Sequence, residues 1–517
     1  MNTVLDTSFT RPRSNRESAR QRRRRWLAAF LTAGLTCGVV LAVYSNGWRA
    51  VSYAHCGAGE WVSPAGLRTA GVAADDAGAA ECIGVSASSN FGVDALSPVM
   101  ARFDQQNRDA AADPARKTVT VAVLTPVPKH AFGAASEDQV RDLLEGAAQA
   151  QHDVNEGPQG PAVQVVVANE GSAEQGWAPV VDQLVRRTGS ESPLVAVTGL
   201  GVSVKETLLG AHALSDADIP MVGAVLTANG LNARGVVEDF DGGDEVPSGP
   251  IDGFFLVSPN NRREAEALAD RLEEERGKSS YQLVRDLNRD DFYTVGLANS
   301  LQAAFGSQVS EFPITFAGNA GEDEISFSLE NAADRACASG DDAVLYGGRA
   351  SQLLPFLKQL PTCQRPMTVI TGSDAANLDP AEVPAQVRVV YAALADPDAL
   401  RSPKFNPRAA DFEQFGERFH AAPGSGANLA NGWAIMEYDA MKAAAAGIAR
   451  AVKGRQDRVP DPVSVTGGIS GYSDPDHRIG GAGDGFYFDM TTGEPRGRAI
   501  HVVEIDDRKR APLRTAY

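Results

Sequence analysis

The 517-residue chain has few of the residues on which metal and nucleophilic chemistry depend. Its seven histidines are scattered without the short spacing of zinc ligands, so a metal site is not expected. No local arrangement of serine, histidine and aspartate suggests a nucleophile with its base, which disfavours the one enzyme hypothesis, an extracellular hydrolase. We therefore expect no enzymatic activity and no cofactor.

Outside the first 25 residues, acidic side chains outnumber basic ones, 64 to 40. Residues 1–25 carry eight arginines against Asp6 and Glu17, a net of +6, which leaves −24 for the rest of a chain whose total is −18. An acidic body repels nucleic acid phosphates, so DNA and RNA are not expected as partners. With 43% hydrophobic and 22% charged residues the chain is otherwise typical of a globular protein, and it is long enough for more than one domain.

One long apolar run, residues 26–44, directly follows four consecutive arginines. Its 19 uncharged residues nearly span the ~30 Å hydrocarbon core of a membrane, and the arginines favour a cytoplasmic N-terminus. We interpret residues 1–25 as a basic cytoplasmic tail and 26–44 as a transmembrane signal anchor. A cleaved signal peptide is an alternative, and a lipoprotein signal at Cys37 is disfavoured because Thr36 precedes it and the run continues. All three interpretations place residues from about 50 onward outside the cytoplasm. The signal anchor predicts a single-pass protein of the cell membrane, with residues from about 45 onward extracellular.

Cysteine is rare, with five in the chain. Cys37 lies in the apolar run, which leaves Cys56, Cys82, Cys337 and Cys363. Outside the cytoplasm, disulfides are favoured over free thiols. Four cysteines allow three connectivities, of which the simplest joins Cys56 to Cys82 and Cys337 to Cys363.

A regular alternation of apolar strands and amphipathic helices begins at Lys117. The predicted strands cover 118–125, 162–168, 194–198, 220–225, 253–257, 281–286, 310–316, 342–346, 366–370 and 387–393. The predicted helices cover 136–155, 177–188, 203–214, 260–276, 291–305, 324–336, 350–360, 408–421 and 429–452. This order predicts an α/β fold with right-handed crossovers and parallel sheets. Because the strands are too many for one sheet, we expect two doubly wound, three-layer lobes.

The same pattern suggests where the lobes begin and end. Residues 45–116, rich in glycine, alanine and serine, are expected to form an extracellular stalk and disulfide collar. Lobe 1 is predicted to span 117–256, with about 385–455 returning to it. Lobe 2 is predicted to span 257–384, with about 456–517 returning to it. Within the tail, 485–505 is typical of two strands joined as a hairpin by a Thr-Thr-Gly-Glu turn.

The stretch "VAVTGLGVSVKET", residues 195–207, places a glycine turn between a strand and a helix. It lacks the glycine spacing of a dinucleotide loop and the Gly-Lys-Ser/Thr of a Walker loop, and Lys205 breaks a nucleophile elbow. Ser203 and Glu206 instead match a capping box, which predicts Ser203 as the helix N-cap. The helix start would then direct its N–H groups into the crevice beyond the strands, where open α/β sheets bind ligands.

Four other strand exits carry polar or aromatic residues. "IPMVGAVLTANG" leads to Thr227, and "VRDLNRDDFYTVGL" leads from Asp286 to Tyr293. "AVLYGGRA" ends at Arg349, and "VITGSDAA" contains Asp374. Their recurrence on both predicted lobes favours a shared ligand site over a set of unrelated turns.

Over about residues 117–505, the chain resembles the type I periplasmic solute-binding proteins. The resemblance rests on the segments just quoted and on "LLEGAAQAQHDVN", "FLVSPNN", "YDAMKAAAAGI" and "GFYFDMTTGEP", taken in the order in which they occur along the chain. Within that family, the chain resembles the branched-chain amino acid-binding receptors of ABC importers. The resemblance implies two lobes joined by hinge strands that close on a small polar solute, with an ABC permease or another membrane protein as partner.

The resemblance also implies roles for single residues. Ser203 and Thr227 would hold a ligand carboxylate, and Tyr293 would cover the ligand from lobe 2. Asp374 stands where an acid, glutamate in the most similar members, pairs with the ligand ammonium. Arg349 stands where a second aromatic is usual, and an uncompensated arginine would favour a more acidic ligand.

Two other functions share this fold. One is a sensor that regulates a membrane partner, and the other is a structural module that has lost its ligand. A further motif, "EDFDGGDEV" with Asp239, Asp241 and Asp244, lacks the final glutamate of a calcium loop and is interpreted as a solvated loop.

Overall fold

The computed structural model describes residues 60–62, 81–128, 135–157, 160–238, 240, 246–272, 279–422, 426, 428–453, 458–483 and 485–516. All of them belong to one compact unit that begins at Cys56. The expected cytoplasmic tail and the signal anchor at 26–44 lie outside the described residues. Within the ranges given, no helix combines the length and the apolar composition needed to cross a membrane.

Lobe 1 is built on a seven-stranded sheet with the order β1-β2-β4-β3-β5-β6-β7. Its strands are Glu60–Val62 (β1), Ile83–Ser86 (β2), Thr118–Thr125 (β3), Ala162–Asn169 (β4), Leu194–Gly199 (β5), Met221–Gly223 (β6) and Phe254–Leu256 (β7). Strands β3 to β7 are parallel, whereas β2 runs antiparallel to β4 and β1 antiparallel to β2. In β3 every residue after the first is buried, as expected for a strand covered on both faces.

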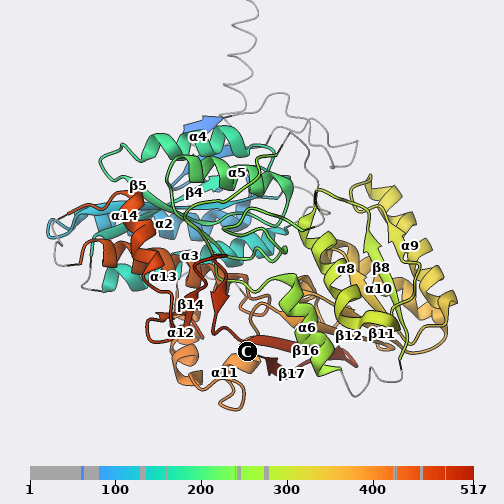
Figure 1. Cartoon of the computed structure of the whole chain (residues 1–517). Helices are drawn as coiled ribbons and strands as arrows, with labels where there is room; N and C mark the ends of the chain where they lie inside the picture. Colours follow the sequence, from blue (N-terminus) through green and yellow to red (C-terminus); the bar gives the residue numbers. More distant parts are fainter. Residues whose placement is uncertain are drawn as a thin grey trace, which may run out of the picture. The chain divides into compact units, whose positions relative to one another are not determined.

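Helices cover both faces of the lobe 1 sheet. They are Ser97–Ala112 (α2), Glu137–Glu156 (α3), Trp177–Arg187 (α4), Lys205–Asp216 (α5), Ala409–Ala421 (α12), Trp433–Ala451 (α13) and Pro462–Ser470 (α14). One apolar cluster joins the sheet to α2, α3, α13 and α14, and a second joins it to α4 and α5. Figure 1 shows α13, from the C-terminal part of the chain, packed beside α3.

Lobe 2 is built on a second seven-stranded sheet, with the order β17-β16-β12-β11-β10-β8-β9. Its strands are Tyr281–Asp286 (β8), Ile314–Phe316 (β9), Ala343–Gly347 (β10), Met367–Thr371 (β11), Val387–Ala393 (β12), Ile500–Asp506 (β16) and Lys509–Ala516 (β17). Strands β8 to β12 are parallel, and β16 and β17 extend the sheet in antiparallel pairing.

The helices of lobe 2 also lie on both faces of its sheet. They are Asn261–Arg271 (α6), Phe292–Phe305 (α8), Glu322–Ser339 (α9) and Ala350–Gln359 (α10). Apolar residues of α6 and α8 form one cluster with the sheet, and those of α9 and α10 form another. Both lobes are therefore three-layered in their described parts, as the strand-helix alternation predicts.

Several predicted boundaries are wrong. Residues 81–116 are not a stalk, because β2 pairs with β4 and α2 packs into the lobe 1 core. Strand β12 pairs with β11, so the range 385–455 begins in lobe 2, and only its helices α12 and α13 return to lobe 1. In the range 456–517, α14 packs on α13 and β5 of lobe 1, whereas β16 and β17 do join lobe 2.

The predicted C-terminal hairpin is half right. Gly485–Phe488 (β14) pairs with Pro495–Arg496 (β15) across the turn that contains Thr-Thr-Gly-Glu, and Ile479–Gly480 (β13) adds a third short strand. The apolar run after Arg498, however, becomes β16 and pairs with β12 instead. The chain passes between the two sheets after β7, after β12 and before β16. A short helix, Pro397–Arg401 (α11), lies in the second of these connections.

Candidate functional site

The parallel strands of both lobes follow the same doubly wound order, and each order reverses once. In lobe 1 the reversal lies between β3 and β5, and in lobe 2 it lies between β8 and β10. The crevice at the carboxyl ends of such strands is the usual ligand position in open α/β sheets. The predicted site residues Ser203 and Arg349 follow β5 and β10, so the topology places both beside a reversal point.

Ser203 is buried, but it is not the helix N-cap that the capping-box pattern predicts. Helix α5 begins at Lys205, with Val204 in extended geometry as its N-cap. Val204 forms an antiparallel bridge with Asp291 of lobe 2, which holds the chain extended for one residue longer. The Ser203 hydroxyl instead accepts hydrogen bonds from the backbone N–H groups of Thr227 (3.0 Å) and Ala228 (3.2 Å).

The loop before Ser203 owes its shape to glycine. Gly199 and Gly201 have φ of 81° and 64°, which glycine adopts at little cost, and they flank Leu200, whose φ of 67° is uncommon for a residue with a side chain. This backbone turns sharply out of β5 and brings Ser203 beside Thr227. The two predicted carboxylate-binding residues therefore lie together on lobe 1, joined by a direct hydrogen bond.

Tyr293, Arg349 and Asp374 form a second group, on lobe 2. The Arg349 guanidinium lies 4.6 Å from the centre of the Tyr293 ring, within cation–π distance. Its Nη1 lies 3.7 Å from Oδ2 of Asp374. The Tyr293 hydroxyl accepts the backbone N–H of Asp374 at 3.2 Å, and Gly372 leaves room for it, since a Cβ there would lie 2.8 Å from that oxygen.

Asp291 completes this group and was missed by the sequence analysis. Arg349 donates to both of its carboxylate oxygens, from Nε to Oδ2 (2.7 Å) and from Nη2 to Oδ1 (2.8 Å). Asp291 is also the N-cap of α8, accepting the N–H of Thr294. That capping position, an aspartate directly before the apolar start of α8, was the one signal in the sequence that pointed to it.

Burial and charge shift the titration of this group. Burial lowers the pKa of Arg349, but Asp291 and Asp374 outweigh it and raise the pKa above its ordinary value. Burial raises the pKa of Asp374, and Arg349 opposes that shift. Burial, with Asp374 and Glu264, also raises the pKa of Tyr293, so its phenol stays neutral.

Glu264 of α6 lies behind the Asp374 turn. Its Oε2 accepts the N–H of Ser373 at 3.1 Å, and its Oε1 is buried with no hydrogen-bond partner among the residues that the structure describes. Burial raises the pKa of Glu264 to about 8. The backbone of the turn is thus held by two side chains, Glu264 and Tyr293, which together orient Asp374.

Direct bonds join the two groups across the lobes. The Tyr293 N–H donates to the carbonyl of Ser203 (3.2 Å), and the Lys205 N–H donates to the carbonyl of Asp290 (3.0 Å). The Asn261 N–H of lobe 2 donates to the Thr227 carbonyl of lobe 1 at 2.7 Å. The first N–H group of α5, at the helix start that the sequence predicted to face a ligand, therefore donates to a backbone carbonyl of lobe 2.

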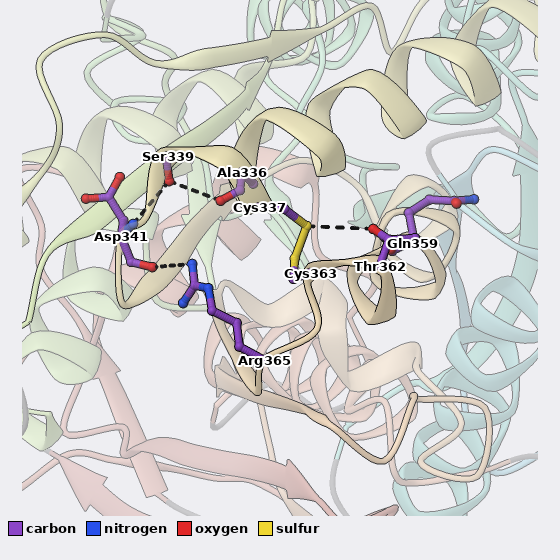
Figure 2. The surroundings of a disulfide bond; sticks show 8 residues. All are labelled: Ala336, Cys337, Ser339, Asp341, Gln359, Thr362, Cys363 and Arg365. Carbon is purple, nitrogen blue, oxygen red and sulfur yellow. Dashed lines mark hydrogen bonds between the residues drawn. A yellow bond between two sulfur atoms is a disulfide. The ribbon is translucent and has the colours of Figure 1, made fainter.

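The cysteines are partly placed. Cys337 at the end of α9 and Cys363 after α10 form a disulfide, with their Cα atoms 4.9 Å apart. Figure 2 shows it between the two segments, with the Thr362 side chain beside the Cys337 sulfur. Cys82 is also disulfide-bonded, whereas Cys56 lies outside the described residues, as do Asp239, Asp241 and Asp244 of the acidic loop.

No family model matches this sequence, and no curated protein matches it either. Solved structures do resemble it. A leucine-binding protein from Thermotoga maritima is 18% identical, with a TM-score of 0.56 over 77% of this chain and 98% of its own. A branched-chain amino acid transporter substrate-binding protein from Streptococcus pneumoniae, in complex with isoleucine, is 15% identical, with a TM-score of 0.58 over 77% and 99%.

A third neighbour widens the range of ligands. It is a solute-binding protein of an ABC transporter from R. palustris in complex with benzoate, 14% identical, with a TM-score of 0.55 over 77% of this chain and 96% of its own. These neighbours are solute-binding proteins rather than enzymes. At such low identity the likeness establishes the architecture, and the described part of this chain has the type I periplasmic binding protein fold.

Proposed function

We propose that this chain is an extracellular receptor that binds a small, amino acid-like solute between its two lobes and closes on it by hinge motion. The observation that carries the proposal is the convergence of two polar groups. Ser203 of lobe 1, which holds the Thr227 N–H, is bonded to Tyr293 of lobe 2. Tyr293 in turn contacts Arg349 and Asp374, and the two groups lie next to the reversal point of each sheet. The neighbouring proteins in complex with isoleucine and benzoate support the same class of ligand.

In this proposal each group recognises one end of the solute. The Ser203 hydroxyl and the nearby backbone N–H groups hold a carboxylate, and Asp374 holds an ammonium. The direct bonds between Ser203 and Tyr293 and between Lys205 and Asp290 are then the lobe-to-lobe contacts of the closed form. A solute bound only by the closed form stabilises closure by its differential affinity.

A thermal unfolding screen of the full chain tests this function. A solute at 100 times its dissociation constant raises the unfolding free energy by about 2.7 kcal/mol. We expect such a shift from at least one neutral amino acid, and its loss in Ser203→Ala and Asp374→Asn. Asp379→Asn, an exposed aspartate five positions further on, is the matched control and keeps the shift. No shift from amino acids, their amides or benzoate contradicts the proposal.

A ligand-less module of the same fold is the second candidate. It is favoured by one observation, that the polar groups of Ser203, Arg349 and Asp291 are already satisfied by protein partners. Small-angle scattering separates the two. A receptor becomes more compact when its solute is added, whereas a ligand-less module keeps one radius of gyration throughout the same screen.

We also propose that residues 26–44 anchor the chain in the cell membrane, with residues from about 45 onward outside. The basis is the apolar run behind Arg22 to Arg25. The receptor then delivers its solute to an ABC permease, or acts as a sensor for another membrane partner. Carbonate extraction is expected to leave the chain in the membrane pellet, and protease added to intact cells is expected to digest it. Release into the medium contradicts an uncleaved anchor.

A further inference from the structure

The charge at the lobe 2 side of the site depends on how Arg349 is paired. Arg349 is buried, with 6% of its side chain exposed, and Asp291 is equally buried at 7%. Two short bonds of 2.7 and 2.8 Å join them in a bidentate pair, the strongest geometry between arginine and a carboxylate. Asp374 has only a single approach of 3.7 Å to the same guanidinium.

Other parts of Arg349 also contact the protein. Its flat face lies over the Tyr293 ring, and the residue itself is the N-cap of α10. An arginine so occupied has neither its charge nor its donor pair free for a second carboxylate. Asp374 is more open, with 12% of its side chain exposed. With one arginine against two aspartates, the group has more acid than base.

We infer that Asp291 determines the charge preference of the site: by neutralising Arg349, it makes the site select solutes that carry an ammonium and reject those with a second carboxylate. This inference rests on the proposed function and names the class of solute. It reverses the expectation that an uncompensated Arg349 favours acidic ligands, because the compensating aspartate lies 58 positions away in the sequence.

Three further acids lie near this group. Glu264 lies behind Asp374 and accepts the Ser373 N–H, and on the lobe 1 side Glu174 accepts the N–H of Val202 at 2.8 Å. Burial raises the pKa of both to about 8, so near neutral pH they are largely protonated and offer a second carboxylate no positive charge. Burial and the nearby Asp291 carboxylate raise the pKa of Asp286 to about 6, so Asp286 is ionised at neutral pH and disfavours a second negative charge on the ligand.

Asp291→Asn removes the charge with little other change. Asparagine is as good a helix N-cap as aspartate, so α8 keeps its start. Asp379→Asn is the matched control, because it removes the same charge from an exposed residue outside the site. The probes are glutamine and glutamate, which differ in one charged group, and the measurement is the ratio of their dissociation constants by calorimetry with the full chain.

We expect the wild type and Asp379→Asn to bind glutamine at least about tenfold more tightly than glutamate, a difference of about 1.4 kcal/mol. Asp291→Asn is expected to lower that ratio about tenfold or more. Adding Arg349→Met to Asp291→Asn is expected to restore the wild-type ratio, because the freed cation is then gone. An unchanged ratio in Asp291→Asn overturns the inference alone, whereas binding of no solute by any variant overturns the proposed function with it.

Should Asp291→Asn fold poorly, its stability still answers the question. An uncompensated buried arginine is expected to take glutamate as its counter-ion. Glutamate then raises the unfolding temperature of this variant more than glutamine does. Equal shifts from the two solutes contradict the inference.

Discussion

Buried charge in lobe 2 centres on Arg349, which is 5% exposed and pairs with Asp291 through two hydrogen bonds. Taking two charges out of water is costly, and only close geometry with further hydrogen bonds offsets that cost. Here the stacking on Tyr293 and the cap that Asp291 gives α8 supply those extra contacts. The pair therefore links the start of α8, where Asp291 is the N-cap, to the start of α10, where Arg349 is the N-cap.

Arg349→Met is expected to lower the unfolding free energy by about 3–5 kcal/mol, because it leaves Asp291 buried without its partner. Arg262→Met is the control, since Arg262 pairs with Glu238 at the surface, where both side chains are largely exposed, and it is expected to cost less than about 1 kcal/mol. Urea unfolding of the three proteins measures both values. Equal effects of the two substitutions contradict this account of the buried pair.

For single residues, the sequence predicted which side chains lie at the site, but not which side chains they pair with. Tyr293, Arg349 and Asp374 do meet, because all three follow parallel strands or cap helices at one edge of a sheet. Asp291, which pairs with Arg349, was not among the predicted residues. Sequence spacing cannot show that a side chain at position 349 reaches one at 291, because that distance depends on how β8 and β10 pair.

Close contact between helices depends on small residues at the points where their backbones approach. In α3, a Cβ on Gly146 would lie 2.1 Å from the carbonyl oxygen of Ala434 in α13. In α5, a Cβ on Gly210 would meet no atom within 4 Å. The two glycines occupy similar positions inside helices but have opposite surroundings.

Gly210→Ala is expected to stabilise the protein by about 0.5–1 kcal/mol, because alanine favours the helix and meets open space. Gly146→Ala is expected to destabilise it by about 1–3 kcal/mol or more, because α13 must move away. Denaturant unfolding of both variants measures the signs. The same sign for both would show that helix propensity, rather than the α3–α13 contact, decides these positions.

The disulfide ties the end of α9 to the turn after α10 on one face of lobe 2 (Figure 2). It closes a segment with a sequence separation of 26 residues, and such loops stabilise by about 2–4 kcal/mol. The double variant Cys337→Ser, Cys363→Ser is expected to lose that amount in thermal unfolding. The wild type treated with reductant serves as comparison. A variant as stable as the oxidised wild type contradicts the prediction.

Across the whole molecule, buried glutamates link stability to pH. Burial raises the pKa of Glu174, Glu264 and Glu437 to about 8, from an ordinary value of 4.5. Between these values the folded state binds more protons than the unfolded state, so stability falls as pH rises. Burial lowers the pKa of His501 to about 4 from 6.5, which has the opposite effect below pH 6.5.

The unfolding free energy is therefore expected to decrease from pH 6.5 to 8, by up to about 1.4 kcal/mol per pH unit for each glutamate. Glu437→Gln is expected to reduce this slope, since its amide oxygen still accepts the Thr198 hydroxyl and no longer titrates. Glu382→Gln, whose side chain is half exposed, is expected to leave the slope unchanged. An unfolding free energy that rises with pH in this range, or a pH dependence that Glu437→Gln leaves unchanged, contradicts the prediction.

One arginine, Arg498, joins two of the connections between the lobes. Arg498, just before β16, donates to the carbonyl of Val257 after β7 at 3.1 Å. It also forms a buried ion pair with Asp439 of α13, a helix that the chain reaches after leaving β12. Arg498 thus ties the connection after β7 and the connection before β16 to a helix of lobe 1.

By itself, the sequence determined the α/β class, most helices and strands after Lys117 and the strand exits that carry polar side chains, because periodicity and caps are local properties. Only the tertiary structure decided which strands pair, and so placed β12 and β16 in one sheet and Asp291 beside Arg349. It also moved the start of α5 from Ser203 to Lys205, through a bridge to lobe 2. These outcomes depend on contacts between segments that are distant in the sequence. Such contacts form when two whole sheets are buried, and local residue spacing does not encode them.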